Sequence, residues 1–363
     1  MRNLKFSKTA GTEFSSALKN KINQYFKTKQ ISRFGNRSMI TKTVIMLLLF
    51  FAPLTIIDIG MVSSPLILFL LFIMSGLGMA GIGMGIMHDA IHGSYSSSSR
   101  VNKIMGYTMN LIGANEIVWK IQHNVLHHTY PNVDQADDDI NAPFFLRFSP
   151  HAKRYWLHRY QHIYIWLFYG LSTLSWITTK DFIRVIRYRK LGFLPGPGEL
   201  RRSILNIIGW KLLYYSYALV LPLLMVPLAP WIIILAFLSM HFVTGTLISI
   251  VFQTAHVMPG NEFPLPDKNG LIANNWYIHQ LATTSNFSPG NRVLSWLIGG
   301  LNYQIEHHLL PHVCHVHYRK LSDIVAETAL EFGITYRTKK TFASAIWDHI
   351  KMLRQLGRYE SLA

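Results

Sequence analysis

Residues 212–261 read LLYYSYALVLPLLMVPLAPWIIILAFLSMHFVTGTLISIVFQTAHVMPGN, a run of 50 residues without Asp, Glu, Lys or Arg. A transmembrane helix needs about 20 mostly apolar residues. The run is therefore long enough for two such helices, which we place at 212–228 and 231–252. The residues between them, Val226 to Pro230, predict a tight turn, so that the two helices form a transmembrane hairpin.

A second apolar region lies upstream, where no charged residue occurs between Asp58 and Asp89. Together with the residues before it, this region predicts two more spans, at 43–60 and 65–87. The fold class predicted from the sequence is therefore an all-α integral membrane protein, with four transmembrane helices in two hairpins.

The composition of the whole chain agrees with a membrane protein. Of its 363 residues, 50% are hydrophobic and only 15% are charged, whereas a soluble domain carries about 25% charged residues. The formal net charge of +17 would also fit a nucleic-acid-binding protein, but such proteins lack long uncharged runs. We therefore exclude nucleic acid as a partner. The single cysteine, Cys314, excludes an intrachain disulfide and a cysteine-based metal site within one chain.

The basic residues predict the orientation of the chain. Ten lie in residues 1–42, 14 in 88–204 and 10 in 253–363, and none lies in either predicted hairpin turn. Because loops rich in Lys and Arg stay on the cytoplasmic side, both termini are expected there. The N-terminus lacks a short apolar core followed by a cleavage site, so we expect no cleaved signal peptide. The basic residues 1–42 are expected to lie at the surface of an anionic membrane.

Residues 163–179 are also uncharged, but 17 residues is a borderline length for a span. Seven of the basic residues in 88–204 precede this segment and seven follow it. Equal basicity on both sides predicts an interfacial or re-entrant helix, whose two ends stay on the same side of the membrane.

Histidine, with 17 residues, carries the functional signal. Isolated histidine pairs are expected by chance in such a chain, whereas the pattern His123-x-x-x-His127-His128 is not. His88 and His92 lie one helical turn apart and share a helix face. Eight histidines follow predicted spans in a way that allows them to meet at one membrane surface: His88, His92, His123, His127, His128, His256, His307 and His308.

Eight imidazoles are too many for one ion, because first-row metals take four to six ligands. They suit two metal ions with about four or five ligands each. Neutral imidazole favours iron, copper, zinc or nickel over magnesium and calcium, and zinc has no redox role. Two redox metals beside an apolar interior suit oxygen-dependent attack on an unactivated C–H bond of a lipid, which side chains alone cannot perform.

Three clusters resemble, in order, the three histidine boxes of the integral-membrane fatty acid desaturases: HDAIH at 88–92, HNVLHH at 123–128 and QIEHH at 304–308. The leading Gln304 of the third box is similar to the front-end and bacterial acyl desaturase branch. The resemblance covers roughly residues 40–325 and includes the FQTAH segment that ends at His256. It implies a four-span fold with a cytoplasmic helical cap that holds a histidine-rich di-iron centre.

The function implied by this resemblance is a fatty acyl desaturase. Such an enzyme uses dioxygen and two electrons to insert a cis double bond into an acyl chain carried by CoA or by a lipid. It would be a multi-pass protein of a bacterial inner membrane or of the endoplasmic reticulum. The chain has no HPGG motif of a fused cytochrome b5 domain, so the electrons are expected from a separate ferredoxin or cytochrome b5. An acidic donor would be attracted to the basic cytoplasmic face.

The resemblance also divides the chain and assigns its ligands. It implies a basic cytoplasmic N-terminal segment at 1–42, a desaturase domain at 43–325 and a cytoplasmic C-terminal tail at 326–363. The eight histidines named above are the implied iron ligands. Gln304 stands where other branches carry a histidine ligand. Whether it binds the metal, binds through water or orients another ligand stays open.

Other polar and aromatic residues near the boxes receive supporting roles. Asp89, Asp138 with its two aspartate neighbours, and Glu306 are interpreted as acceptors of imidazole N–H bonds, with helix capping or a solvated loop as the alternative. Asn115 and Trp119 would share one helix face if their segment is helical. The resemblance implies an aromatic residue near there along the acyl tunnel, and packing in the core is the alternative.

The remaining histidines are expected outside the metal site. His241 lies 15 residues before His256, or about 22 Å along a helix, so we expect it to make a polar contact between helices. The run after the third box includes His312, His315 and His317, whose role is unassigned. The others are expected at the interface or the surface: His151, His158, His162, His279 and His349.

Two other functions stay open at this point. A hydroxylase begins with the same hydrogen abstraction, and ligand spacing does not separate it from a desaturase. A metal transporter would place its ligands along a path near the midplane of the bilayer, whereas here only His241 lies within a predicted span. The sequence alone gives neither the position of the double bond nor the acyl carrier, which could be CoA, acyl carrier protein or phospholipid.

Overall fold

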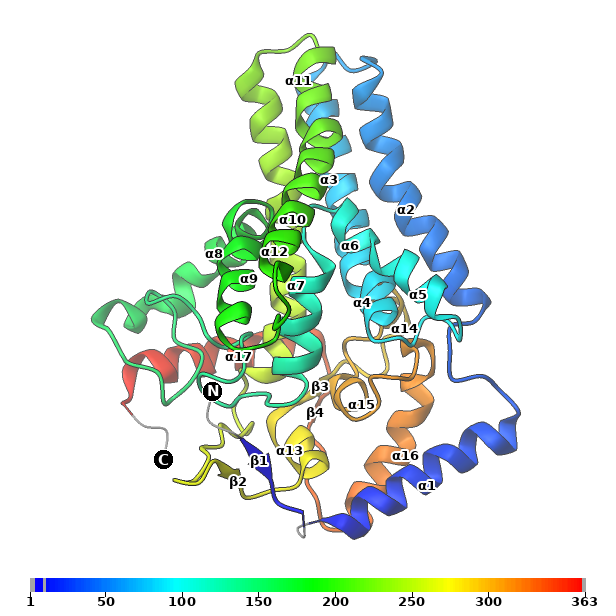
Figure 1. Cartoon of the computed structure of the whole chain (residues 1–363), viewed down its shortest axis with the longest axis vertical. Helices are drawn as coiled ribbons and strands as arrows, with labels where there is room; N and C mark the ends of the chain where they lie inside the picture. The colour runs from blue at the N-terminus through cyan, green and yellow to red at the C-terminus, as the bar shows by residue number, and fades with distance from the viewer. Residues whose placement is uncertain (1–3, 9–10, 361–363) are drawn as a thin grey trace. The chain divides into compact units, whose positions relative to one another are not determined.

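The computed structural model describes residues 4–8 and 11–360 of the chain and is mainly helical (Figure 1). The chain divides into two units. Unit 1 comprises Met1–Gly35, Gln122–Ile165 and Ile250–Ala363, and unit 2 comprises Asn36–Ile121 and Trp166–Ser249. The predicted terminal segments 1–42 and 326–363 include residues 1–3, 9–10 and 361–363, which lie outside the described residues.

Unit 2 contains most of the apolar helices. Its α-helices are α2 Arg37–Asp58, α3 Pro65–Gly81, α4 Met87–Ile91, α5 Ser99–Gly106, α6 Thr108–Leu111, α7 Glu116–Lys120, α9 Asp181–Lys190, α10 Glu199–Tyr215 and α11 Leu221–Met225. Three π-helical segments adjoin these helices: η1 Ile82–Ile86 precedes α4, η4 Trp176–Lys180 precedes α9 and η5 Ser216–Val220 precedes α11. Three further helices run from one unit into the other: η2 Ile121–His127, α8 Gln161–Ser175 and α12 Pro230–His256.

Among the described residues, four helices are long and apolar enough to cross a membrane: Arg37–Asp58, Pro65–Ile91, Glu199–Met225 and Pro230–His256. Their number equals the number of spans predicted from the sequence. The uncharged segment 163–179 falls within α8 and η4 and is not one of the four.

The third of these helices begins at Glu199, 13 residues before the predicted span, and includes the charged Lys211. The ammonium group of Lys211 donates hydrogen bonds to Asp181 Oδ2 at 2.8 Å, to the Gly113 carbonyl at 2.9 Å and to the Trp176 carbonyl at 2.7 Å. A buried charge is tolerated only when it is paired and hydrogen-bonded. These three partners therefore allow Lys211 to lie inside the helix, although the sequence pattern alone predicts that the span starts after it.

The helices of unit 2 approach one another closely at glycines of α3. A Cβ atom at Gly78 would lie 2.5 Å from the backbone nitrogen of Phe50 in α2, and one at Gly76 would lie 2.7 Å from the carbonyl oxygen of Met240 in α12. Ser75 Oγ also donates to the Phe50 carbonyl at 3.0 Å. Because packing and interhelical hydrogen bonds drive helix association in lipid, small residues are required at these contacts.

We expect Gly78→Ala to lower the free energy of unfolding by about 1–3 kcal/mol, because the added methyl group meets backbone atoms that cannot rotate away. Gly209→Ala in α10 is the matched control, since a Cβ atom there meets nothing within 4 Å. It should raise the stability of its helix by about 0.4–1 kcal/mol. Thermal unfolding of both purified variants in one detergent measures the difference, and equal stabilities would contradict the close approach of α2 and α3.

Unit 1 combines short strands with helices. Its elements are β1 Lys5–Phe6, α1 Thr12–Lys29, the 3₁₀ helix η3 Trp156–Tyr160, β2 Leu271–Ile272, α13 Trp276–Thr283, β3 Asn286–Phe287, α14 Arg292–Leu297, α15 Gln304–Leu309, the 3₁₀ helix η6 His315–His317, α16 Tyr318–Glu331, β4 Thr338–Lys339 and α17 Phe342–Arg358. Two parallel strand pairs form: β1 with β2, in which Lys5 is opposite Leu271, and β3 with β4, in which Asn286 is opposite Thr338.

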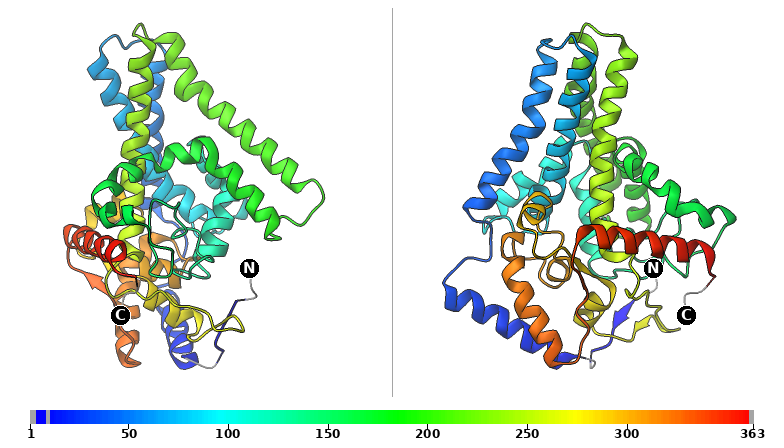
Figure 2. Two further views of the ribbon diagram at one scale, coloured as in Figure 1. Left: turned by 90° about the vertical axis from the view of Figure 1, so that its left-hand side faces the viewer. Right: turned by 180° about the vertical axis from the view of Figure 1, so that it is seen from behind.

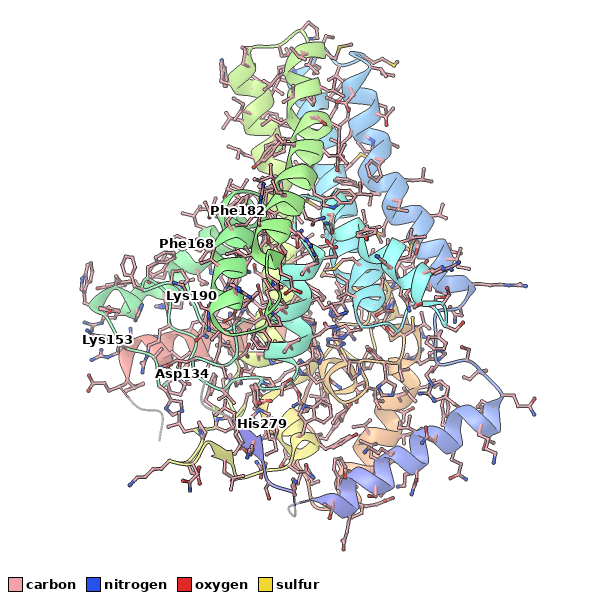
Figure 3. All side chains as sticks on the ribbon, viewed as in Figure 1. Asp134, Lys153, Phe168, Phe182, Lys190 and His279 are labelled. Atoms are coloured by element: carbon pink, nitrogen blue, oxygen red, sulfur yellow. The ribbon has the colours of Figure 1, made fainter. Side chains whose placement is uncertain are left out.

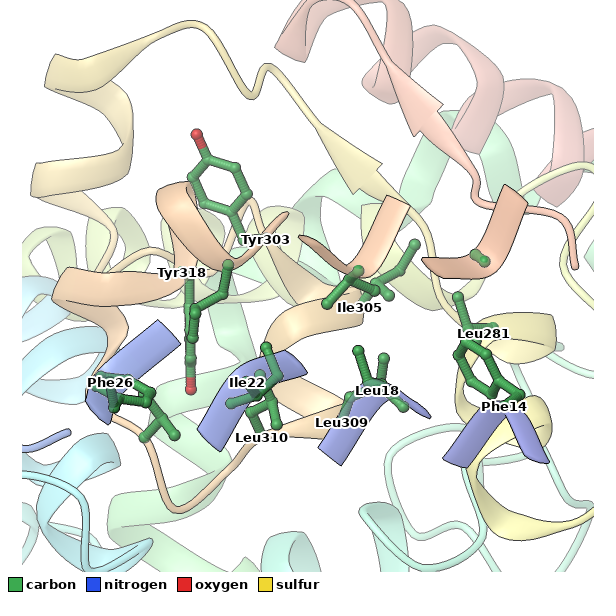
Figure 4. Packing of buried hydrophobic residues seen from close by; sticks show 14 residues of the cluster. Phe14, Leu18, Ile22, Phe26, Leu281, Tyr303, Ile305, Leu309, Leu310 and Tyr318 are labelled. Carbon is green, nitrogen blue, oxygen red and sulfur yellow. The ribbon is translucent and has the colours of Figure 1, made fainter. Parts of the chain in front are cut away.

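The N-terminal helix α1 supplies part of the core of unit 1 (Figure 4). Its buried residues recur every fourth position, which places them on one helix face: Phe14, Leu18, Ile22 and Phe26. They pack with residues of α15, α16 and the turn between them, including Leu309, Leu310, Tyr318, Leu321 and Val325. Figure 2 shows α1 beside α16. The apolar face of this basic segment is therefore covered by protein.

Candidate metal centre

Six of the eight predicted ligands form one buried cluster of imidazoles in unit 1. The distance between Nε2 atoms is 2.9 Å from His128 to His307, 3.2 Å from His128 to His123, and 3.2 Å from His308 to His256. Ring nitrogens of His127, His256 and His308 also lie within 4.8 Å of one another. The six Nε2 atoms thus converge, although they come from three separate segments of the chain.

Box two owes its shape to the π-helix η2 and the turn that follows it. The backbone N–H of His128 donates to the carbonyl of His123 at 2.9 Å, a bond between residues five apart. In a helix bonded in this way, residues four and five apart both stay on the same side. His127 and His128 can therefore face the same space as His123. In a regular α-helix of 3.6 residues per turn, His128 would point away from His123.

In three of these imidazoles, the outer ring nitrogen, Nδ1, is bonded to a hydrogen-bond acceptor. Asp137 Oδ1 lies 3.0 Å from Nδ1 of His127, Gln280 Oε1 lies 2.9 Å from Nδ1 of His308, and the carbonyl of Thr283 lies 3.3 Å from Nδ1 of His256. Because an acceptor requires a proton on Nδ1, the Nε2 atom of each neutral ring carries the free electron pair. Metal-binding histidines are usually held in this form.

Among the described residues, Nε2 of His127 is a buried polar atom with no hydrogen-bond partner. The same holds for the nearby amide of Gln304, of which neither the oxygen nor the nitrogen is bonded. Leaving a buried polar atom unsatisfied costs about 1–3 kcal/mol. Gln304 lies three and four residues before His307 and His308 on α15, so the three side chains share one face. A bound metal ion or its water would satisfy these atoms, and the nitrogen-rich donor set fits a transition metal.

Nearby negative charge and burial shift the pKa values of these imidazoles in opposite directions. Burial lowers the pKa of His127, but the negative charges of Asp137 and Asp139 outweigh it and raise that pKa to about 9. Burial, reinforced by the neighbouring imidazoles, lowers the pKa of His308 well below its usual 6.5. His308 is therefore neutral, and His127 is a strongly basic donor whose proton a metal must displace.

The loop after box two is tied to the end of α12. Asp137 Oδ2 accepts a hydrogen bond from the backbone N–H of Asn132 at 2.9 Å. The amide of Asn132 donates to the carbonyl of His256 at 3.1 Å and to that of Glu262 at 3.0 Å. Asn132 has a φ of 60°, a conformation that asparagine tolerates better than most residues. One buried asparagine thus links the Asp137 loop to the His256 backbone.

Box one lies in unit 2, where His88 is near the start of the short helix α4 and His92 is its C-cap. The ring centres of His88 and His92 are 4.9 Å apart, and the indole of Trp119 lies 5.5 Å from the first and 6.2 Å from the second. Asn115 is the N-cap of α7: its side-chain oxygen accepts from the N–H groups of Ile117 and Val118, and its nitrogen donates to Asn206.

A family model described as fatty acid desaturase matches residues 63–340. The chain belongs to the fatty acid desaturase family. It is 34% identical to the sn-1 linoleoyl-lipid 6-desaturase of Arthrospira platensis, in a match that covers 97% of this chain and 94% of the relative. The protein of the same name from Synechocystis sp. is 32% identical, with 98% of each chain covered. The acyl-lipid (8-3)-desaturase of Physcomitrium patens is 34% identical over 98% of this chain and 74% of its own length.

Membership of the family agrees with the function expected from the histidine boxes. The desaturase is an oxidoreductase that acts on fatty acyl chains, and its family is membrane-bound. Its buried imidazole cluster fits a metal site.

The structure corrects the partners expected for one acidic residue of the desaturase. The carboxylate of Glu306 accepts hydrogen bonds from Asn286 Nδ2 at 2.7 Å and from the hydroxyl of Tyr336 at 3.0 Å, and not from an imidazole. Its neighbours on α15 bear the box-three histidines, and adjacent helical residues point in different directions. Burial raises the pKa of Glu306 to about 7.

The aspartates near the boxes are placed less simply than expected. Asp137, one of the three aspartates interpreted as imidazole acceptors, holds the imidazole of His127. Asp139 Oδ2 lies 3.6 Å from Nδ1 of His127 and 3.7 Å from Nδ1 of His123. Asp138 is buried, and so is Asp89, whose backbone carbonyl accepts hydrogen bonds from the backbone and hydroxyl groups of Ser94.

Histidines outside the boxes have structural partners. His241 contacts Tyr214 OH at 2.6 Å and Thr173 Oγ1 at 3.2 Å, which is the predicted polar contact between helices. Three histidines expected at the surface or interface are instead fully buried and bonded to backbone carbonyls: His158 to Phe144, His279 to Pro131 and His349 to Val257. Figure 3 labels His279, which lies on α13. A lone histidine gives no sequence signal for such a carbonyl partner.

Proposed function

We propose that this desaturase inserts a cis double bond into an acyl chain of a membrane lipid at a centre of two iron ions. The observation that supports a metal centre best is the inward convergence of imidazole Nε2 atoms whose Nδ1 atoms are bonded to outer acceptors. The choice of a lipid-linked chain over acyl-CoA follows the names of the relatives, which are linoleoyl-lipid and acyl-lipid desaturases.

The proposed ligands are the seven box histidines and His256: His88, His92, His123, His127, His128, His256, His307 and His308. Gln304 is proposed as a ninth donor, through its amide oxygen or through a water molecule, because its amide is buried and unbonded. The bound iron would supply the reduction of dioxygen that removes two hydrogen atoms from the acyl chain. Its two electrons would come from a separate ferredoxin or cytochrome b5.

The protein side chains would hold and shield that centre. Asp137, Gln280 and the Thr283 carbonyl keep three imidazoles oriented and their Nδ1 atoms protonated. Asp89, Asp138 and Glu306 remain supporting residues, the last through Asn286 and Tyr336. Complete burial of the cluster excludes bulk water, which protects a reactive site from side reactions.

Trp119 is proposed to border the path of the acyl chain, because its buried indole lies against both box-one rings. Asn115 would contribute indirectly, since its side chain caps the helix that carries Trp119 and bonds to Asn206.

The proposed topology has four spans in two hairpins, with a cytoplasmic cap and both termini in the cytoplasm. It is supported by the positions of the basic residues, of which 34 of 35 lie on segments assigned to the cytoplasm, while the remaining one, Lys211, borders a predicted span. The proposed divisions are the N-terminal segment 1–42, the desaturase domain 43–325 and the C-terminal tail 326–363. The host membrane would be a bacterial inner membrane or the endoplasmic reticulum.

We expect a new double bond to form when the desaturase is expressed in a bacterium that makes only saturated and monounsaturated chains. The cells receive linoleate and a ferredoxin with its reductase, and fatty acid methyl esters are analysed by gas chromatography and mass spectrometry. If the substrate is an acyl-lipid, labelled linoleate should gain the bond first in the glycerolipid fraction. Hydroxylated chains without a new alkene would instead indicate the hydroxylase, and first appearance in acyl-CoA would contradict the lipid-linked substrate.

A further inference from the structure

The C-terminal helix α17 has one buried face and one basic face. Its buried residues are Ala345, His349, Met352, Leu353, Leu356 and Gly357. On the other side, Trp347, Lys351, Arg354 and Arg358 recur at intervals of three and four residues and are all exposed, so they form a single stripe. The indole of Trp347 is 59% exposed. The apolar face of α17 is buried against the protein, yet the large ring of Trp347 is exposed among the basic residues of the opposite face.

The 3₁₀ helix η3 packs against α17 within unit 1 (Figure 1). The contact is close: a Cβ atom at Gly357 would fall on the backbone carbonyl of His158. Next to this contact Trp156 is 80% exposed and Ile163 is 64% exposed. Lys153, labelled in Figure 3, lies in the loop before η3, with Nζ 5.2 Å from the ring centre of Tyr155.

Together these residues form what we call the η3–α17 surface: Trp156, Arg159, Ile163, Trp347, Arg354 and Arg358. Among the described residues, no carboxylate lies within salt-bridge distance of the three arginines. The nearby acids are paired elsewhere, Asp348 with Lys339 at 2.6 Å and Lys351 at 3.1 Å, and Glu360 with Arg154 at 3.8 Å. The positive charge of the surface is therefore available to an outside partner.

We propose that the η3–α17 surface lies against anionic phospholipid headgroups of the membrane that the four spans cross. Tryptophan beside arginine is typical of the membrane interface, where the ring enters the apolar boundary and the guanidinium binds phosphate. Ile163 also begins an apolar stripe on α8, whose exposed members Leu167 and Leu171 follow at four-residue intervals. An acidic soluble protein would match the charge but would not bury this apolar stripe. The surface thus holds unit 1 to the bilayer independently of the metal centre.

A spin label at position 156 tests whether this surface meets lipid. The only cysteine, Cys314, is buried, so the wild-type chain measures background labelling. Trp156→Cys is compared with Leu330→Cys on α16, where the native leucine is 81% exposed. Both full-length proteins are placed in nanodiscs of phosphatidylcholine mixed with phosphatidylglycerol. We expect collisions with oxygen, relative to those with a water-soluble nickel chelate, to be several-fold more frequent at 156 than at 330.

Charge variants test the anionic headgroups. Each arginine near an anionic surface should favour the lipid-immersed state of the label roughly fivefold. Arg354→Gln with Arg358→Gln should therefore shift the immersion equilibrium roughly 25-fold toward water, since the two fivefold effects multiply, while Arg319→Gln with Lys320→Gln on α16 should leave it unchanged. A shift of equal size in pure phosphatidylcholine would overturn the role of anionic lipid.

The label also separates a lipid from a protein partner. Equal accessibility ratios at 156 and 330 in both nanodisc compositions would overturn the proposal. Protection of position 156 only after an acidic ferredoxin is added would overturn it as well, and would assign the surface to the electron donor. Because immersion is measured without turnover, its outcome is independent of whether the desaturase activity is found.

Discussion

His307→Ala is expected to reduce desaturation to below detection and to lower the iron content of the purified protein below the proposed two ions per chain. The Nε2 atom of His307 lies 2.9 Å from that of His128, and ring nitrogens of His307, His128 and His308 lie within 4.8 Å of one another. Removing one donor from such a group leaves its partners without the geometry that a transition metal requires. Product analysis by mass spectrometry and metal analysis of the same preparation measure the two effects together.

His151→Ala is the matched control for this change. His151 is an exposed histidine of the same unit, and its Nε2 contacts the Phe263 carbonyl at 2.8 Å. The control should keep both activity and metal, and circular dichroism should show that both variants are folded. Full activity and full metal content in His307→Ala would disprove the proposed ligand set, and His123→Ala provides an independent repeat at box two.

Asp137→Asn is expected to weaken metal binding by about 10- to 100-fold, the usual effect of losing the outer partner of a metal-binding histidine. The change keeps the size of the side chain but removes its charge. In the metal-free protein that charge helps to hold the pKa of His127 at about 9. Without it, the effect of burial is less opposed and the pKa should fall, which makes the ring a weaker donor. Competition with a chelator of known affinity measures the loss.

Asp134→Asn is the control for the charge change. Asp134 lies in the same loop, three residues before Asp137, and is only partly buried. It should bind metal as tightly as the wild-type protein. Equal affinities in all three proteins would mean that Asp137 does not support the ligand.

The sequence predicted which histidines lie close together within each box, because residues so near in sequence stay near in the folded chain. His88 lies in α4 and His92 is its C-cap, with ring centres 4.9 Å apart, and His307 and His308 share α15. Box two was predicted from pattern alone, although its three rings face one space only because the backbone adopts π-helical bonding. A pattern of residue types does not report such a change of helix type.

The outer partners of the ligands could not be predicted in the same way. Gln280 and Thr283 come from α13, a segment without any metal-binding motif, and reach His308 and His256 through tertiary packing. The run of three aspartates does not show which carboxylate meets which imidazole, and Asp137 is the one that bonds to His127 at 3.0 Å. Glu306 was assigned to an imidazole by its position beside the histidines, but helical geometry turns it toward Asn286 and Tyr336.

The four spans were predictable from uncharged runs, but one boundary was not. The predicted third span starts after Lys211. The helix instead includes Lys211, because Asp181 and two backbone carbonyls surround its ammonium group. Those partners are 30 or more residues away in sequence, beyond what a local charge count can detect.

The packing of α1 on α16 also sets an order of events during synthesis. Lys21 of α1 forms a salt bridge with Glu331, 310 residues later in the chain. The apolar face of α1 therefore emerges from the ribosome early and stays without α16 until nearly the whole chain has been synthesised. Contacts between such distant segments form slowly, and exposed apolar faces attract chaperones or aggregate meanwhile. The proposed metal ligands extend to His308, so a metal centre built from them is also complete only late in synthesis.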